Sequence, residues 1–173
     1  MAVVIWELSA LTAMRPWSTR MICSACGDGK VALASDHAGF GLKEVLKEHL
    51  SGRGVTPVDL GTDSIQSVEY PDYAMKVCEA VLTGSADKGI LICGTGLGMT
   101  MMANRYKGIR GALCHDHFTA RASRSHNDSN VLILGGRILG TDLAKEIVDT
   151  WLDTPFEGGR HEKRIRKFDE ETS

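Results

Sequence analysis

The sequence predicts an α/β domain in which a five-stranded parallel sheet lies between two layers of helices. Five short apolar runs after position 30 are near-continuous rather than alternating, as is typical of strands buried on both faces. Segments with the apolar spacing of helices separate these runs, and such an alternation favours parallel strands joined by right-handed crossovers. We therefore expect a Rossmann-like three-layer sandwich, followed by an exposed C-terminal helix.

Each element has its own signal in the sequence. The expected strands cover residues 31–34, 55–60, 89–93, 109–114 and 130–134. Three helices between them are marked by apolar stripes at helical spacing, which are Leu42, Val45, Leu46 and Leu50, then Ala74, Val77, Cys78 and Val81, then Ala144, Ile147, Val148 and Trp151. Pro71 opens the second of these helices, and glycines end the first. The charged segment 160–171 predicts the C-terminal helix.

Composition limits the class of protein. The 173 residues carry 20 Lys and Arg against 22 Asp and Glu, so neither a general nucleic-acid surface nor a basic membrane-docking surface is expected. No stretch approaches the roughly 18 apolar residues of a membrane span. Five cysteines, an odd number, do not indicate a secreted disulfide framework, and we expect a cytoplasmic protein. We expect residues 1–29 to be a poorly ordered N-terminal extension and residues 30–173 to form the domain.

Polar and glycine-rich segments follow four of the five expected strands. In open α/β sheets, ligands bind at the carboxyl ends of the strands, near the point where the strand order reverses. The segments begin at Asp36 after the first strand, at Cys93 at the end of the third, at His115 after the fourth and at Gly135 after the fifth. The sequence therefore predicts a site at this edge of the sheet.

The segment from Cys93 to Gly98 carries most of the expected chemistry. Its three glycines at alternate positions allow a tight turn whose backbone N–H groups form a nest for an anion. A helix is expected to start near Leu97, and its N-terminal dipole adds to the positive field. A thiol at this place is expected to have a lowered pKa and to act as a base or nucleophile, although most cysteines are inert buried groups.

Three other kinds of glycine loop do not fit this segment. A dinucleotide-binding fingerprint needs its third glycine at position 99, where the chain has Met99. The lysine and hydroxyl of a phosphate-binding P-loop are missing as well. A cysteine phosphatase needs an arginine at the same position 99. The loop is therefore expected to serve a different reaction.

Histidines and the remaining cysteines divide into candidates and packing residues. His37 and His126 each sit beside polar neighbours at loop positions, and either is a candidate acid or base, or a satisfied surface histidine. Metal is not expected, because the pair Cys23 and Cys26 has no second ligand pair, and His115 and His117 have no clear third ligand. Cys78 and Cys114 are expected to be packing residues.

The basic C-terminal segment offers an anion site. Arg160 and Arg164 are four residues apart and share one helix face after two glycines. Two guanidinium groups on one side suit a phosphate monoester. The segment also fits a solvated helix face, which is the usual role of a charge run. A nucleic-acid patch fits less well, because Glu162 and the acidic residues after it dilute the positive charge.

Taken together, the motifs resemble those of the type B ribose-5-phosphate isomerases and the related galactose-6-phosphate isomerase subunits. The resemblance covers residues 30 to about 168 and keeps the family's order. Its motifs are Ser35-Asp36-His37-Ala38-Gly39-Phe40, Tyr70-Pro71-Asp72-Tyr73, the run from Gly89 to Gly98, Ala103-Asn104-Arg105, Ser125-His126-Asn127-Asp128, Gly135-Gly136-Arg137 and Glu157-Gly158-Gly159-Arg160-His161. Each motif is weak alone, and the set is specific.

The resemblance implies a reaction and a role for each site residue. The reaction is the reversible isomerisation of D-ribose 5-phosphate and D-ribulose 5-phosphate in the pentose phosphate pathway, by proton transfer through a cis-enediolate without metal or organic cofactor. Cys93 would be the base, and His126 would open the furanose ring. The implied oxyanion donors are Thr95 and the N–H groups of Gly94, Gly96, Leu97 and Gly98. Asp36 and His37 would line the pocket, Tyr70 would flank the sugar ring, and Asn127 would contact a sugar hydroxyl. The phosphate or the far end of the sugar would be held by Arg137, Arg160 and Arg164.

The resemblance also implies an assembly and leaves rival functions open. Family members build the site across a dimer, some of them pairing further into tetramers, so we expect a homodimer with a shared active site. One branch places a glutamate base where this chain has Met99 and a glycine where it has Cys93, which favours the thiol here. The alternatives are an isomerase of a 6-phosphohexose, such as allose or galactose 6-phosphate, and a non-catalytic phospholigand-binding module.

Overall fold

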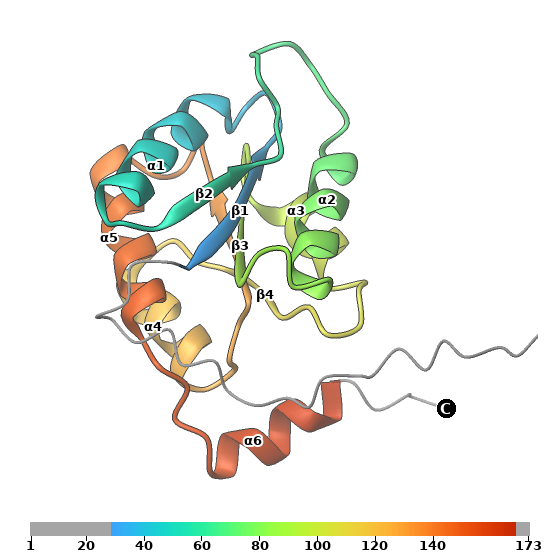
Figure 1. Cartoon of the computed structure of the whole chain (residues 1–173), viewed down its shortest axis with the longest axis vertical. Coiled ribbons are helices and arrows are strands. Elements are labelled where there is room, and N and C mark those ends of the chain that lie inside the picture. The colour runs from blue at the N-terminus through green and yellow to red at the C-terminus, as the bar shows by residue number, and fades with distance from the viewer. Residues whose placement is uncertain (1–28, 169–173) are drawn as a thin grey trace, which may run out of the picture.

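The computed structural model of the chain describes residues 29–168 and confirms the expected sheet (Figure 1). All five strands are parallel, in the order β2-β1-β3-β5-β4. The strands are β1 (Lys30–Ser35), β2 (Thr56–Asp59), β3 (Lys88–Cys93), β4 (Gly111–Leu113) and β5 (Val131–Gly135). Each strand overlaps the apolar run that predicted it. The two outer strands, β2 and β4, are the shortest, and each begins later and ends earlier than its predicted run.

Six helices accompany the strands. They are α1 (Phe40–Gly52), α2 (Tyr70–Leu82), α3 (Leu97–Ala103), α4 (His117–Ser125), α5 (Thr141–Asp153) and α6 (Arg160–Ile165). The C-terminal helix is shorter than its charged segment, because a 3₁₀ turn over Arg166–Phe168 follows α6. Most of α6 is exposed, but His161 and Ile165 on its inner side are buried.

The sheet separates two apolar cores, which makes the domain a three-layer sandwich. Helices α1, α4 and α5 cover one face, and α2 and α3 cover the other (Figure 1). Successive residues of the central strands alternate between the two cores, with Leu91 on the α2 side and Ile90 and Ile92 on the α1 and α5 side. Because both sides are buried, the strands read as continuous apolar runs in the sequence.

The strand order reverses between β1 and β3, and this point positions the site. The chain goes from β1 outward to β2, then returns to β3 on the other side of β1. In the register, Ser35 of β1 is the partner of Ile92, and Cys93 is the partner of Gly135 of β5. The segments that begin at Asp36, Gly94 and Gly136 therefore leave the sheet side by side, as expected for a ligand crevice of this fold.

Two further expectations concern the ends of the chain and membranes. The extension expected over residues 1–29 lies outside the described residues, except for Gly29. Within residues 29–168, none of the helices is long and apolar enough to cross a membrane.

Candidate active site

The thiol of Cys93 ends the central strand β3 and sits in a backbone cradle. Its side chain is buried, and the backbone N–H of Gly96 donates to the sulfur at 3.1 Å. This hydrogen bond holds the sulfur against the backbone of the glycine loop. Gly96 has φ +81°, and a Cβ there would lie 2.3 Å from Cδ1 of Leu113. Only glycine fits this position, so the sequence pattern of the loop follows from the geometry of the cradle.

The remainder of the loop leads from Cys93 into α3. Thr95 is exposed, and its hydroxyl accepts a weak hydrogen bond from the N–H of Leu97 at 3.4 Å. Gly98 approaches Tyr70 at the start of α2 so closely that a Cβ at Gly98 would lie 2.7 Å from the tyrosine ring. Tyr70 is partly exposed beside this loop. A hydroxyl, several backbone N–H groups and an aromatic ring therefore surround the same stretch of backbone.

The segment after β1 stands next to this loop. The carboxylate of Asp36 accepts hydrogen bonds from the N–H groups of Ala38 and Gly39 at 2.9 and 3.0 Å. A Cβ at Gly39 would lie 2.6 Å from the carbonyl oxygen of Ile92, so the two segments are in direct backbone contact. Nδ1 of His37 accepts from the N–H of Val68 at 3.4 Å, which leaves Nε2 as the protonated nitrogen of the neutral ring.

Arg137 completes the group at the carboxyl edge. Its backbone N–H donates to the carbonyl oxygen of Gly94 at 3.0 Å, and its exposed side chain runs alongside the same glycine. The structure therefore brings together the following predicted site residues at one edge of the sheet: Asp36, His37, Tyr70, Cys93, Gly94, Thr95, Gly96, Leu97, Gly98 and Arg137. We call this set the carboxyl-edge group.

The other predicted site residues lie at the opposite edge. Helix α4 runs back along the sheet, so His126 and Asn127 come directly before β5 begins at Val131. The backbone N–H of Glu157 donates to the carbonyl oxygen of Ser125 at 3.0 Å, which holds the segment leading to α6 beside His126 and Asn127. The five residues of β5 span roughly 17 Å. One chain therefore keeps His126, Asn127, Arg160 and Arg164 a strand's length away from Cys93.

His126 is part of a cluster that we call the amino-edge cluster, formed by His126, Glu157, Arg160 and His161. The rings of His126 and His161 are stacked, with centroids 4.4 Å apart and planes 6° apart. Oε2 of Glu157 lies 4.0 Å from Nε2 of His126 and 3.9 Å from Nε2 of His161. Burial lowers the pKa of His161, and the nearby His126, Arg160 and Arg164 lower it further, against an opposing effect of Glu157.

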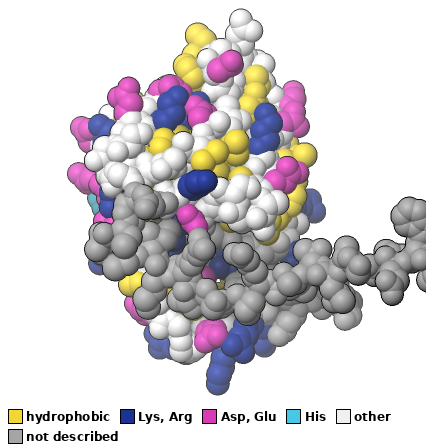
Figure 2. Space-filling model, viewed as in Figure 1, with side chains coloured by type: hydrophobic (Ala, Val, Ile, Leu, Met, Phe, Trp, Pro, Cys, Tyr) yellow, Lys and Arg dark blue, Asp and Glu magenta, His cyan; other side chains and the backbone are white. Residues whose placement is uncertain are grey.

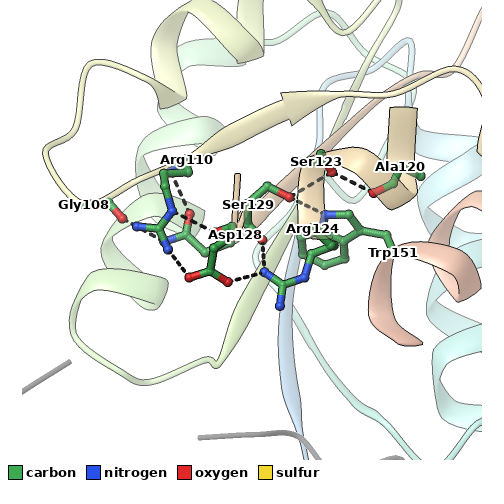
Figure 3. Close-up of polar contacts among 9 residues, drawn as sticks. Gly108, Arg110, Ala120, Ser123, Arg124, Asp128, Ser129 and Trp151 are labelled. Carbon is green, nitrogen blue, oxygen red and sulfur yellow. Dashed lines mark hydrogen bonds and ion pairs between the residues drawn. The ribbon is translucent and has the colours of Figure 1, made fainter. Parts of the chain in front are cut away.

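A buried network of charges and hydroxyls holds the loop that carries His126 (Figure 3). The carboxylate of Asp128 accepts from Arg110 and from Arg124, both at 2.8 Å. Arg124 also donates to the carbonyl oxygen of Ser129, whose hydroxyl accepts from Nε1 of Trp151 at 2.7 Å. Asp128 has φ +46°, a conformation that Asp and Asn tolerate better than most residues. The network fixes the backbone directly after His126 and Asn127.

Basic side chains gather at the end of the molecule where α6 lies (Figure 2). A cavity of about 870 Å³ on this side is lined by Gly159, Arg160, Lys163, Arg164, Lys167 and Phe168. The basic residues of this lining follow the spacing of one helix face, and they are Arg160, Lys163, Arg164 and Lys167. Arg160 and Arg164 therefore share a face, as expected. A second cavity of about 710 Å³ includes Asn127 and Arg110 in its lining.

The rejected metal-ligand candidates and the cysteines expected in packing have structural roles or lie outside the described residues. Asp116 caps α4 by accepting from the N–H of Thr119, and His117 contacts Glu146 at 2.9 Å, so the His115–His117 segment serves the helix start. Cys78 and Cys114 are buried in the cores, which confirms them as packing residues. Cys23 and Cys26 lie outside the described residues.

Comparison with known proteins decides the family. The model of a family described as Ribose/Galactose Isomerase matches residues 31–168, which is nearly all of the described chain. The chain belongs to the ribose/galactose isomerase family. It is a sugar-phosphate isomerase, because relatives that match it over the same length are ribose-5-phosphate isomerases.

Members of the family resemble this isomerase over almost their whole length. It is 49% identical over 136 residues to ribose-5-phosphate isomerase B of Escherichia coli, which covers 79% of this chain and 91% of that one. A crystal structure of a ribose 5-phosphate isomerase from Thermotoga maritima is 59% identical, with a TM-score of 0.80, and covers 82% of this chain and 97% of that one. The enzyme from Mycoplasma genitalium, solved with bound ribulose-5-phosphate, is 42% identical, with a TM-score of 0.78, and covers 81% and 93%.

Sequence reasoning about the isomerase missed two members of the amino-edge cluster. His161 looks like one more residue of a charged tail, yet it is buried on the inner side of α6 and stacked on His126. Glu157 lies four residues before His161, but the chain between them is a glycine turn rather than a helix. The helical stripe that Ile165 shares with His161 is the signal that could have marked this inner side.

Proposed function

We propose that the isomerase interconverts D-ribose 5-phosphate and D-ribulose 5-phosphate through a cis-enediolate. The observation that carries the proposal is the cradle of Cys93, where a strand-end thiol accepts a backbone hydrogen bond inside a glycine loop. Moving a carbonyl from C1 to C2 needs a base over an acidic C–H bond, donors for the developing oxyanion and an anchor for the phosphate. The residues present supply all three, and the proposal includes no metal or organic cofactor.

The steps follow from these positions. The Cys93 thiolate takes the proton from C2 of the open-chain aldose, and the electrons of that bond form the C1–C2 double bond while O1 becomes an oxyanion. Thr95 and the N–H groups of the loop stabilise this charge, and preorganised donors of this kind contribute about 3 kcal/mol each to lowering a barrier. The proton then returns from sulfur to C1, and a proton transferred from O2 to O1 completes the ketose.

The proposed ring opening and phosphate binding use residues of both sheet edges. His126 would transfer protons between the ring oxygen and the anomeric hydroxyl, with Asn127 on a sugar hydroxyl. Arg137 is in the carboxyl-edge group, whereas Arg160 belongs to the amino-edge cluster and Arg164 follows it on the same helix. Since a pentose phosphate is far shorter than the sheet, the two sets of residues can act on one molecule only if they come from different chains.

We therefore propose a homodimer in which each site combines the carboxyl-edge group of one chain with the amino-edge cluster of its partner. The separation of Cys93 and His126 within one chain supports it. So does the apolar surface at the carboxyl edge, where four large side chains are exposed beside the site, namely Leu97, Met101, Phe118 and Ile138. Exposed apolar surface at the rim of a half-complete site fits a second copy of this chain.

The reaction is tested with an isomerase assay on ribose 5-phosphate. We expect Cys93→Ala to abolish turnover while the circular dichroism spectrum stays unchanged. Cys78→Ala is the matched control, because Cys78 is a fully buried residue of α2 and burial raises the pKa of its thiol to about 11. Retention of more than a few per cent of kcat by Cys93→Ala would contradict the base assignment. Higher kcat/KM for allose or galactose 6-phosphate would replace the pentose with a hexose as substrate.

The shared site is tested by mixing two inactive variants. Subunits of Cys93→Ala and His126→Asn are denatured together and refolded, and half of the random dimers then carry one intact site, so activity should return to about a quarter of the wild-type value. Each variant refolded alone is the control. If each site belonged to one chain, every chain in the mixture would keep its own defect and no activity would return, and that outcome would contradict the shared site.

The proposal extends to the limits of the domain and to its location. The family match over residues 31–168 supports a single domain over 30–173 with an appended segment at 1–29. Cys78, Cys93 and Cys114 are all free thiols, which supports a reducing, cytoplasmic environment.

A further inference from the structure

We propose that His126, Glu157 and His161 form a binding site for a divalent transition metal ion, with Zn²⁺ as the best fit, and that its occupancy inhibits the isomerase. The site itself depends only on the amino-edge cluster. The inhibition also rests on the proposed role of His126 in ring opening.

The geometry brings three ligand atoms of suitable type to one point. One ring nitrogen of His126, one of His161 and a carboxylate oxygen of Glu157 all lie within 4.8 Å of one another, and Oε2 of Glu157 is 4.0 and 3.9 Å from Nε2 of the two histidines. Ligand atoms around a tetrahedral Zn²⁺ with bonds near 2.1 Å are about 3.5 Å apart. Closing the site therefore requires the ligand atoms to move closer together and one of the two stacked rings to turn, because the lone pairs of parallel rings do not point at the same ion.

The donor set selects the kind of ion. Two imidazole nitrogens and one carboxylate oxygen are a ligand set used at zinc sites that keep a fourth position open to water. Mg²⁺ and Ca²⁺ prefer sites made of oxygen ligands, so the two histidines disfavour them. Among the described residues, this is the only group of three His, Cys, Asp or Glu side chains close enough to hold an ion.

The contact between His161 and Arg160 suits a ligand. A metal-binding histidine must present a lone pair to the ion. Nε of Arg160 donates to Nε2 of His161 at 3.4 Å, so this nitrogen carries the lone pair that a metal needs. Arg160 and the ion therefore compete for the same atom.

The backbone around the ligands is already in place, while one ring is free to adjust. The N–H of Glu157 is bonded to Ser125, and the N–H of His161 is bonded to Gly158 at 3.1 Å. The His126 side chain is 45% exposed, so its ring can turn out of the stack and direct Nε2 at the ion. An ion held there removes the lone pair that His126 needs for proton transfer, which explains the inhibition.

The site is tested on the full chain by titration with Zn²⁺ against a chromophoric chelator and by the absorption spectrum with Co²⁺. The parent protein carries Cys23→Ser and Cys26→Ser, which removes the CxxC pair as a competing site. We expect one ion per chain and a Co²⁺ spectrum of tetrahedral type without a thiolate charge-transfer band. Glu157→Gln and His161→Asn should each weaken binding at least about tenfold, as losses of metal ligands do.

Two variants make the test specific. Arg160→Gln should tighten Zn²⁺ binding, because it removes the group that competes for Nε2 of His161. His117→Asn is the matched control, since His117 and Glu146 form an exposed His–Glu pair outside the site, and it should change nothing. Unchanged affinity in Glu157→Gln and His161→Asn, or a thiolate band with Co²⁺, would overturn the proposal.

The inhibition is measured separately, so that its failure differs from failure of the proposed function. Zn²⁺ should inhibit turnover of ribose 5-phosphate at the concentrations that fill the site, and a chelator should restore it. Full occupancy with undiminished turnover would overturn the inhibition. An inactive metal-free enzyme would instead contradict the proposed function, and the Co²⁺ spectrum would still decide the metal site.

Discussion

The carboxyl-edge group and the amino-edge cluster are held in place by different means. Backbone groups position Cys93, because the N–H of Gly96 donates to its sulfur and the N–H of Arg137 donates to the carbonyl oxygen of Gly94. Side chains position His126, through its stack with His161 and through the ion pairs of Asp128 in the loop that follows it. The carboxyl-edge group is rigid because the strand ends of the sheet form it, whereas the amino-edge cluster depends on a few polar contacts between side chains.

The difference fits the two chemical tasks that we propose. Proton transfer between carbon atoms needs a base and oxyanion donors held to a fraction of an ångström, which strand ends can provide. Ring opening transfers protons between oxygen atoms, and a half-exposed histidine on a helix end suits it. The following predictions test this contrast, from the largest expected effect to the smallest.

Gly39→Ala should damage the carboxyl-edge group most. A Cβ there would lie 2.6 Å from the carbonyl oxygen of Ile92, so the segment that begins at Asp36 must move. A displacement of about 1 Å near reacting groups costs roughly a hundredfold in kcat/KM. The control is Gly41→Ala in α1, where a Cβ meets nothing within 4 Å and activity should persist. Full activity of Gly39→Ala would show that this half is less rigid than its backbone contacts imply.

Asp128→Asn should destabilise the amino-edge side. The change removes the charge shared by Arg110 and Arg124, both nearly buried, and asparagine keeps the left-handed backbone conformation. We expect the free energy of unfolding to fall by about 2 to 3 kcal/mol, measured by denaturant titration. Asp142→Asn on the exposed start of α5 is the control, with a change near zero. An equally small change for Asp128→Asn would mean that the network does not support this half.

His126→Asn should slow only the substrate that must open a ring. We expect at least about a tenfold loss of kcat/KM with ribose 5-phosphate, as for removal of a general acid–base group. D-erythrose 4-phosphate cannot close a furanose ring, because its O4 carries the phosphate, and its turnover should change far less. His117→Asn serves as the control on both substrates. Equal losses on the two sugars would remove His126 from ring opening.

Lys88→Met should stabilise the protein in a pH-dependent way. Lys88 begins β3, the strand that ends in Cys93, and burial together with Arg124 lowers its pKa from 10.5 to about 8. Between these two values the unfolded chain binds more protons, so the stability of the wild type rises with pH. Removing the charge should add about 1 to 2 kcal/mol at pH 7, less the lost contact with the Trp151 ring.

The gain from Lys88→Met should shrink as the pH approaches about 10, where the folded wild type no longer carries this charge. Denaturant titration at both pH values measures it, with Lys145→Met on the surface of α5 as the control. A variant that is less stable than the wild type at pH 7 would show that the contact with Trp151 outweighs the cost of burying the charge.

The fold and the placement of the carboxyl-edge group could be predicted from sequence because their signals are local. Buried parallel strands leave continuous apolar runs, and a glycine loop at a strand end marks where backbone must turn, as Gly96 does with its positive φ. His161 could not be recognised in the same way. Its burial depends on how α6 packs against the end of α4, and nothing in the sequence of the charged segment predicts that contact.

The sequence alone therefore determined the order of strands and helices along the chain and the placement of the carboxyl-edge group around Cys93, because periodicity and turn chemistry are local properties of the chain. Only the tertiary structure decided that His126 is stacked on His161 beside Glu157. The reason is that this contact joins the end of α4 to α6, two elements far apart in the chain that are brought together only by packing.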